Sequence, residues 1–176
     1  MLSVAKILRG LKELFTMTKK KFDNQSAKTP VILVVDDNRE NLELLEAYLE
    51  DIDCRTVSAY DGPEALDIVK KDKPDLILLD IMMPKMSGFE VCRKLKADPA
   101  TADIPIIMVT ALNEFGDMQR GVDCGTDDFV SKPVNKIEML TRVKTMLKLK
   151  HLTDKLERTL AYLAEIEKQT QSSRFD

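Results

Sequence analysis

The chain has 176 residues, enough for one domain with a full hydrophobic core and short extensions, but not for a second large domain. Its 44% hydrophobic and 32% charged residues are typical of a soluble globular protein and exclude global disorder. The net charge of -3 argues against a nucleic-acid partner, and no apolar run reaches the roughly 20 residues of a membrane span.

Residues 1–28 are predicted to form a basic amphipathic helix and a linker. Apolar residues recur at helical spacing between basic ones, at Val4, Ile7, Leu8, Leu11, Leu14 and Phe15. Three lysines and a polar stretch then predict a flexible linker up to residue 28. Three interpretations stay open: the helix lies on an anionic membrane, it packs on the domain, or translation begins at Met17 and the helix is not made.

Residues 29–148 alternate between strand-like and helix-like patterns. Continuous apolar runs predict buried parallel strands at 31–35, 76–79 and 106–109, with weaker candidates at 54–58 and 128–130. Helical patterns between them are carried by Leu42, Leu45 and Leu49; Ala65, Leu66 and Val69; Phe89, Val91, Cys92 and Leu95; and Met118 and Val122. The order predicts an α/β fold, a doubly wound five-stranded parallel sheet whose functional crevice lies beyond the carboxyl ends of the strands.

Reactive side chains follow four of the five predicted strands: Asp36 and Asp37, Asp80, Thr110, and Lys132. Three carboxylates in one partly desolvated pocket repel each other unless a cation lies among them, and an oxygen-only site suits Mg²⁺. Lys132 would be the counter-ion on the other side, and the bond before Pro133 could be cis. The simpler alternatives are that Asp36 and Asp37 only cap a helix, and that Lys132 is an ordinary exposed lysine.

The segments VVDDN, LLDIMMPKMSG, IMVTAL and DDFVSKP resemble the receiver domain of two-component response regulators, over about residues 30–148. The resemblance implies a flavodoxin-like strand order of 2-1-3-4-5. It further implies that the protein is cytoplasmic and accepts a phosphoryl group from a sensor histidine kinase or a histidine phosphotransfer protein. On this reading the chain is not an enzyme and catalyses at most its own phosphorylation and dephosphorylation.

The resemblance also implies a role for each site residue. Asp80 would be the phosphoacceptor, and Mg²⁺ would be held by Asp37 directly, by Asp36 through water and by the backbone carbonyl of Met82. Thr110 and Lys132 would contact the phosphoryl group, and Phe129 would be a rotating aromatic switch, with plain core packing as the alternative. Pro84 and Gly88 fit the family's loop after the phosphorylation site. Met82 and Leu112 occupy positions where polar residues speed dephosphorylation, so we expect a long-lived phosphoryl group.

Residues 149–176 are predicted to extend the last helix, which runs from Asn135 to about Gln169 without proline or glycine. Spacings of three and four predict a short coiled-coil seam with Thr159 as its weak position, formed by Leu149, Leu152, Leu156, Leu163 and Ile166. We expect a homodimer through this helix; the alternative is a helix that folds back on its own domain. His151 is interpreted as a solvated surface residue.

Other functions fit the residues less well. A haloacid dehalogenase phosphatase needs a second aspartate two residues after the nucleophile, where this chain has Met82. A scaffold that is never phosphorylated would not need the acidic cluster, and no helix-turn-helix follows Lys150, which disfavours a DNA-binding output. Finally, Cys54, Cys92 and Cys124 are odd in number and far apart, which predicts reduced thiols and a cytoplasmic protein.

Overall fold

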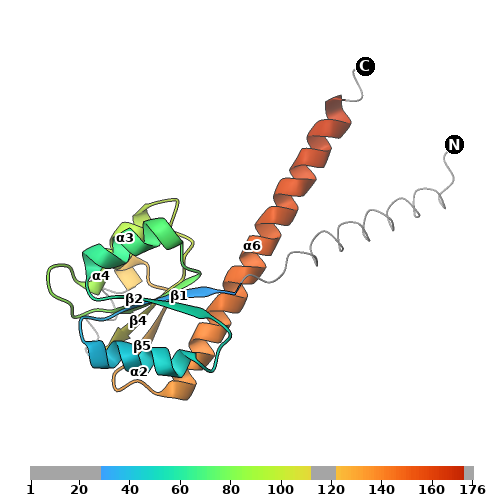
Figure 1. Ribbon diagram of the computed structural model, residues 1–176. Helices are drawn as coiled ribbons and strands as arrows, with labels where there is room; N and C mark the ends of the chain where they lie inside the picture. Colours follow the sequence, from blue (N-terminus) through green and yellow to red (C-terminus); the bar gives the residue numbers. More distant parts are fainter. Residues whose placement is uncertain (1–28, 112–121, 173–176) are drawn as a thin grey trace.

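The fold is an open α/β sheet with a long projecting helix, seen in a computed structural model that describes residues 29–111 and 122–172 (Figure 1). The strands are β1 (Val31–Val35), β2 (Arg55–Ala59), β3 (Leu76–Asp80), β4 (Ile106–Thr110) and β5 (Asp128–Ser131). The helices are α2 (Arg39–Leu49), α3 (Gly62–Asp72), α4 (Gly88–Ala97) and α6 (Lys136–Ser172). All strand pairs are parallel, in the order β2-β1-β3-β4-β5. The predicted fold class and strand order are confirmed.

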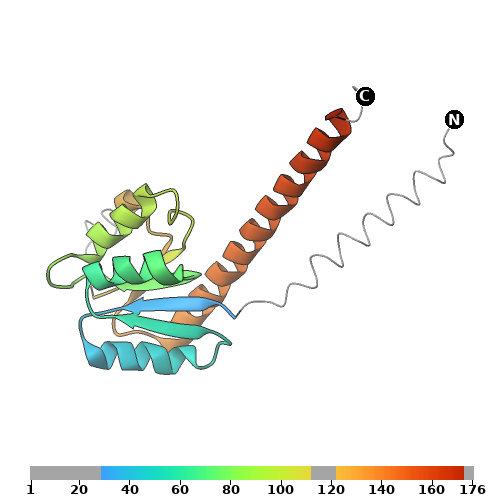
Figure 2. The same cartoon turned by 45° about the horizontal axis from the view of Figure 1, so that its top comes forward.

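Helices cover both faces of the sheet, α3 and α4 one face and α2 and α6 the other (Figure 2). Successive side chains of a strand point to opposite faces, so Leu33 and Val35 pack toward α3 and α4 while Ile32 and Val34 pack toward α2 and α6. All five residues of β1, β3 and β4 are buried, which explains why these strands are apolar throughout except for the last residues of β3 and β4, Asp80 and Thr110. The strand β2, at the edge of the sheet, is more exposed and therefore gave a weaker signal.

Each of three helices begins at a capping side chain. Asn38 accepts hydrogen bonds from the backbone N–H groups of Glu40 and Asn41 at the start of α2, and Asp61 accepts one from Glu64 at the start of α3. Ser87 forms a reciprocal capping box with Glu90 at the start of α4. These caps fix where each helix leaves the crevice at the carboxyl ends of the strands.

The helix α6 contains 37 residues and is about 55 Å long. Its first turns bury Met139, Leu140 and Val143 against the sheet, and the remainder extends away from the body (Figures 1 and 2). It continues through the predicted boundary at residue 148 without a break, because no proline or glycine interrupts it. Among the described helices, α6 included, none has the length and apolar character needed to cross a membrane.

Some predictions concern residues outside the described ranges. The N-terminal helix, Met118 and Leu112 are among these. Val122 lies in a helical turn as predicted, but its side chain is 62% exposed and contributes nothing to the core.

Candidate functional site

The predicted reactive side chains meet at one edge of the sheet because four parallel strands end there. Asp80 is the last residue of β3 and Thr110 the last residue of β4, while Asp36 directly follows β1. Asp80 pairs with Val109 in the register, and Thr110 with Ser131, the last residue of β5 before Lys132. The parallel register therefore brings residues from four distant parts of the sequence to one crevice.

Three carboxylates gather in this crevice, as the sequence predicted. Asp36, Asp37 and Asp80 each offer an oxygen atom within 4.8 Å of the others. Asp36 and Asp80 are buried, with 1% and 4% of their surface exposed, whereas Asp37 is open to solvent. Two of the carboxylates are therefore buried in the protein, and the third lies at the solvent-exposed edge of the crevice, where an ion could enter.

Lys132 lies on the other side of Asp80. Its Nζ is 2.8 Å from Asp36 Oδ2 and 2.6 Å from Asp80 Oδ1, so one ammonium group joins two buried carboxylates. The peptide bond between Lys132 and Pro133 is cis. The alternative of an ordinary exposed lysine is ruled out, because only 23% of the Lys132 side chain is exposed.

Burial and neighbouring charges have opposing effects on the pKa values of Asp80 and Lys132. Burial raises the pKa of Asp80 above its usual value, and the nearby Asp36 adds to this, although the hydrogen bond and charge of Lys132 oppose it. Burial disfavours the ammonium form of Lys132, but its two carboxylate partners outweigh this and raise the pKa of Lys132. One ammonium group thus faces three acids, and the unbalanced negative charge favours binding of a divalent cation.

The donor set fits magnesium. All three side chains are carboxylates, which are hard oxygen ligands, and the exposed position of Asp37 leaves room for the water molecules that Mg²⁺ keeps. Met82 follows Asp80, the last residue of β3, by two residues, and 66% of its surface is exposed. Its backbone carbonyl is the oxygen atom that this residue offers as a further ligand.

Comparison with known proteins gives the family. A family model described as the response regulator receiver domain matches residues 32–144, more than half of the chain. The chain belongs to this family. Receiver domains bind Mg²⁺ at an acidic pocket, and the three aspartates form such a cluster here.

Named relatives agree with this assignment. The response regulator PleD of Caulobacter vibrioides is 46% identical over 125 residues, which are 71% of this chain and 28% of PleD. The DNA-binding dual master transcriptional regulator RpaA of Synechocystis is 41% identical over 68% of this chain and 49% of its own length. The chain therefore spans only a quarter to a half of these curated relatives.

Solved structures match the receiver domain over nearly their whole length. The signal receiver domain of a histidine kinase from Syntrophus aciditrophicus has a TM-score of 0.65 at 36% identity, covering 68% of this chain and 91% of that one. The chemotaxis protein CheY4 of Vibrio cholerae has a TM-score of 0.64 at 28% identity, covering 67% and 98%. The remaining third of this chain thus lies outside the shared domain.

Asn41 is a residue of this receiver site that the sequence analysis missed. Its Nδ2 lies 3.0 Å and 3.1 Å from the two carboxylate oxygens of Asp36, which also accepts the N–H of Asn38 at 2.9 Å. The cap of α2 is Asn38, so the alternative that Asp36 and Asp37 merely cap this helix is wrong. A polar residue one turn into a helix that starts beside a strand-end aspartate is the signal that could have identified Asn41.

Phe129 is half-buried and packs against the hydrophobic cluster under α3 and α4. Thr110, on the neighbouring strand, is buried with 6% of its surface exposed. Met108 pairs with Phe129 in the β4–β5 register, and Thr110 is two residues along β4. The position is compatible with both predicted roles of Phe129, as a switch or as core.

Gly88 brings the start of α4 directly onto the end of β3. A Cβ atom at this position would lie 2.2 Å from the backbone oxygen of Asp80 and 2.9 Å from Cα of Ile81. The N–H of Gly88 donates to the carbonyl of Ile81 at 3.0 Å. Only glycine permits this approach, so the predicted place of Gly88 in the loop after Asp80 has a steric cause.

Proposed function

We propose that this receiver domain accepts a phosphoryl group on Asp80 from a phosphohistidine of a sensor kinase or phosphotransfer protein in the cytoplasm, and thereby switches its interactions with other proteins. The observation that carries the proposal is the buried carboxylate of Asp80 between Lys132 and two further acids. The family match and the lysine contact to both buried carboxylates support it independently. The three cysteines, all in the described part of the chain, are not joined in disulfides, which fits a reducing compartment.

In the transfer step, a carboxylate oxygen of Asp80 attacks phosphorus in line with the phosphohistidine nitrogen. The new O–P bond forms as the P–N bond breaks, and the electron pair of that bond returns to the imidazole. Asp36, Asp37, Asp80 and the Met82 carbonyl would hold Mg²⁺, which supplies positive charge to the phosphoryl oxygens. Lys132 already contacts Asp80 and is placed to pair with the incoming phosphoryl group.

After transfer, the acyl phosphate adds negative charge beside Thr110. The hydroxyl of Thr110 is placed to turn toward the phosphoryl oxygens and Phe129 to fill the vacated space. On this proposal the chain catalyses only its own phosphorylation and dephosphorylation. Its output is a changed surface near β4 and β5, together with self-association through α6.

A groove beside the site supports an approach by a partner protein. It has a volume of about 250 Å³ and lies between α2 and the loop after β5, lined by Asn41, Leu44, Leu45, Tyr48, Lys132, Pro133 and Val134. Leu44 is 43% exposed in it. Because Lys132 contributes to both the groove and the acidic site, a partner helix seated there would bring its phosphohistidine close to Asp80.

The test is labelling of the purified full chain by a small radioactive acyl-phosphate donor, with and without Mg²⁺. We expect base-labile label on the wild-type protein, dependent on Mg²⁺, and none on Asp80→Asn. Asp67→Asn, at an exposed carboxylate on α3, is the matched control and should be labelled normally. Label that persists in Asp80→Asn, or an unlabelled wild-type chain that is folded by circular dichroism, would refute the proposal.

A further inference from the structure

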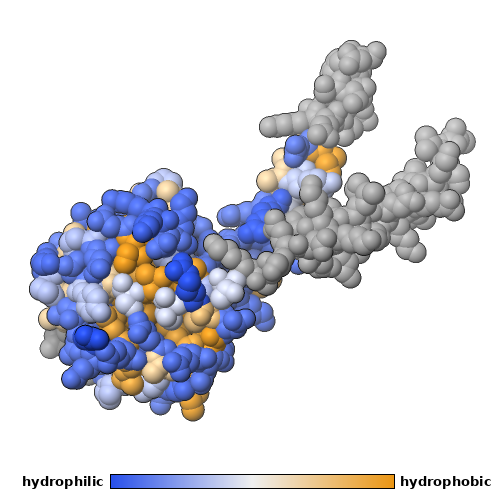
Figure 3. Space-filling view, viewed as in Figure 1, coloured by the Kyte–Doolittle hydropathy of each residue, from blue (hydrophilic) through white to orange (hydrophobic). Residues whose placement is uncertain are grey.

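Five leucines on α6 are exposed to solvent, the first at the point where the helix leaves the domain and the other four beyond it. Leu149, Leu152, Leu156, Leu160 and Leu163 each have between 51% and 59% of their surface exposed. We call this set the leucine face. Figure 3 shows apolar surface among polar residues on the visible part of α6 outside the globular body. A row of half-exposed leucines is costly in water and indicates a contact surface.

The leucine face runs straight along the helix. Its members are spaced by three, four, four and three residues, so at 100° per residue they fall within an arc of about 80°. Leu149 and Leu160 are eleven residues apart, as are Leu152 and Leu163. Eleven residues exceed three full turns by about 20°, and the seven residues that separate Leu149, Leu156 and Leu163 fall short of two full turns by about 20°. The two drifts are opposite, so the mixed spacing favours a nearly straight contact, whereas heptads alone would favour a left-handed supercoil.

Thr159 fits this surface less well than Leu160. The predicted heptad seam included Thr159 and left Leu160 out. The Thr159 hydroxyl donates at 2.8 Å to the carbonyl of Lys155 in its own helix, whereas the Leu160 side chain is 56% exposed. The apolar surface available to a partner is therefore at Leu160.

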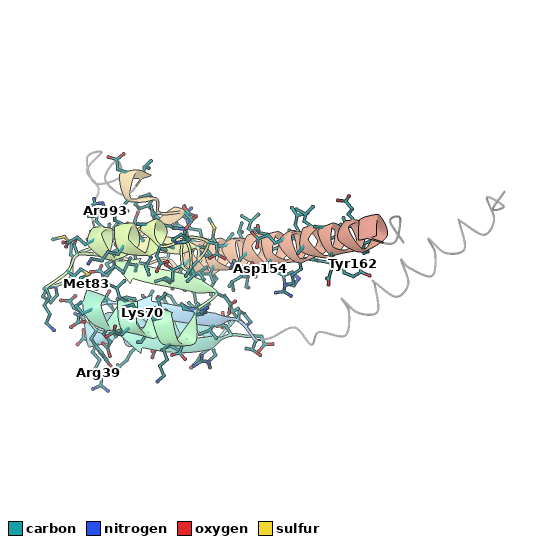
Figure 4. All side chains as sticks on the ribbon, turned by 90° about the horizontal axis from the view of Figure 1, so that it is seen from above. Arg39, Lys70, Met83, Arg93, Asp154 and Tyr162 are labelled. Carbon is teal, nitrogen blue, oxygen red and sulfur yellow. The ribbon has the colours of Figure 1, made fainter. Side chains whose placement is uncertain are left out.

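An anchor on the opposite side of α6 holds the helix in place. Lys150 forms ion pairs with Asp103 of the domain and with Asp154 one turn further along, and only 15% of its side chain is exposed. Asp154 lies where α6 emerges from the body (Figure 4). At 100° per residue, Lys150 and Asp154 lie more than about 100° from the centre of the leucine face. Leu149 lines a groove with Asp103 and Pro105 of the domain, and from Leu152 onward the leucine face is clear of the domain that anchors the helix.

The charges beside the leucine face differ between its two flanks. Lys148 and Lys155 lie on one flank and Glu157 on the other, and all three are exposed. In a parallel pair of identical helices, opposite flanks meet, so Lys155 faces Glu157 of the second copy. In an antiparallel pair, like flanks meet and the lysines repel each other. The charge pattern favours the parallel arrangement.

We propose that the leucine face binds the same face of a second copy of this chain, as a short, parallel and nearly straight helix pair. The proposal extends the self-association included in the proposed function by naming its surface and orientation. The match of the face with itself and the flank charges select a second copy as the occupant. The parallel arrangement holds both receiver domains at the same end of the pair.

Sedimentation equilibrium of the full chain at 5–200 µM tests this surface. We expect the wild-type chain to dimerise, Leu156→Glu to be monomeric, and Leu160→Ala to weaken the dimer about tenfold. Thr159→Ala is the matched control and should change the dissociation constant less than about twofold. A monomeric wild-type chain overturns the proposal. A dimer weakened by Thr159→Ala but not by Leu160→Ala replaces the straight surface with the heptad seam.

Charge reversal tests the orientation. Lys155→Glu should weaken a parallel dimer, and adding Glu157→Lys should restore it. A dimer strengthened by Lys155→Glu alone would show an antiparallel pair and overturn the parallel arrangement. Labelling of Leu156→Glu by the acyl-phosphate donor separates the two proposals, because a monomer that is still labelled at Asp80 retains the receiver function. Circular dichroism must show that each variant keeps its helix content.

Discussion

At the residue scale, Asp36 is held by three groups that donate hydrogen bonds to its carboxylate. These are the backbone N–H of Asn38, the side-chain amide of Asn41 and the ammonium group of Lys132. A buried carboxylate is stable only when its oxygens have such partners. The donors leave Asp36 in one orientation, which prepares the acidic cluster for an ion.

Replacing Asn41 should therefore weaken magnesium binding. Asn41→Ala removes the amide that orients Asp36, and we expect the affinity for Mg²⁺ to fall about tenfold, as for other residues that position metal ligands. Isothermal titration calorimetry of the full chain measures this directly. Glu43→Ala, on an exposed side of α2, is the control and should bind Mg²⁺ like the wild-type chain. Equal affinities for Asn41→Ala and Glu43→Ala would contradict a positioning role for Asn41.

The apolar side chains of Met82 and Leu112 should slow dephosphorylation. Met82 is exposed beside Asp80 and cannot orient a water molecule for attack on the acyl phosphate. We expect Met82→Asn combined with Leu112→Glu to lose its phosphoryl group faster than the wild-type chain does. The decay of label after removal of the donor measures the lifetime. An unchanged lifetime in this double variant would show that these two side chains do not control hydrolysis.

At the scale of elements, short loops at the carboxyl ends of the strands determine where the helices begin. The loop after β3 passes so close to its own strand that α4 must begin with Gly88. The same loop is tied to the cap of α3, because Lys85 pairs with Asp61 at 2.5 Å. The residues around Asp80 are thus positioned by two helix starts.

Gly88→Ala should destabilise the domain by about 1–3 kcal/mol, because the new Cβ would collide with backbone atoms that cannot move without shifting β3. Urea denaturation followed by circular dichroism measures the free energy of unfolding. Ala47→Gly, at an exposed position of α2, is the control for a change between these residue types and should cost about 1 kcal/mol or less. A Gly88→Ala variant as stable as the wild type would contradict the steric argument.

The junction between α6 and the domain should depend on pH. The hydrogen bond from Lys150 is the main reason that the pKa of Asp103 is lowered, although partial burial opposes it. A carboxyl group whose pKa is lowered in the folded state stabilises the fold at pH values above its unfolded-state pKa of about 4. This stabilisation is lost as the pH falls toward the lower pKa of the folded state. We expect Asp103→Asn to be slightly less stable than wild type at pH 7, by less than about 1 kcal/mol since Asp103 is half-exposed.

Urea denaturation of both proteins across pH 3 to 7 checks this linkage. The stability difference between wild type and Asp103→Asn should shrink below about pH 4. A difference that is constant over the whole range would show that the Lys150 anchor does not depend on the charge of Asp103.

At the scale of the whole molecule, the described residues form two surfaces that are available for partners. The groove beside Lys132 lies next to the acidic site, and the leucine face lies on α6 beyond the domain. The helix α6 connects them, because Met139 and Val143 pack under the sheet while Leu156 and Leu163 project into solvent. On the two proposals, α6 would therefore link the phosphorylated domain to the surface of self-association.

The groove should matter for a protein donor but not for a small one. Leu44→Asp places a charge in the groove and leaves Asp36, Asp80 and Lys132 themselves unchanged. We expect at least about tenfold slower phosphotransfer from a phosphohistidine protein and unchanged labelling by a small acyl-phosphate donor. Lys70→Asp, on α3 away from the groove, is the control (Figure 4). Equal loss with both donors would mean that Leu44→Asp disturbs the site itself rather than a docking surface.

The sequence by itself determined the parallel sheet and the residues of the acidic site, and its resemblance to receiver domains implied the strand order. Strands buried on both faces must be continuous apolar runs, and the carboxyl ends of parallel strands must share one edge, so Asp36, Asp80, Thr110 and Lys132 could be placed together without coordinates. Only the tertiary structure placed Asn41 on Asp36, brought Gly88 against β3 and showed that Leu160 rather than Thr159 is open to a partner. Those details depend on how a helix is rotated and how closely two backbones approach, and neither quantity is encoded in the spacing of residues along the chain.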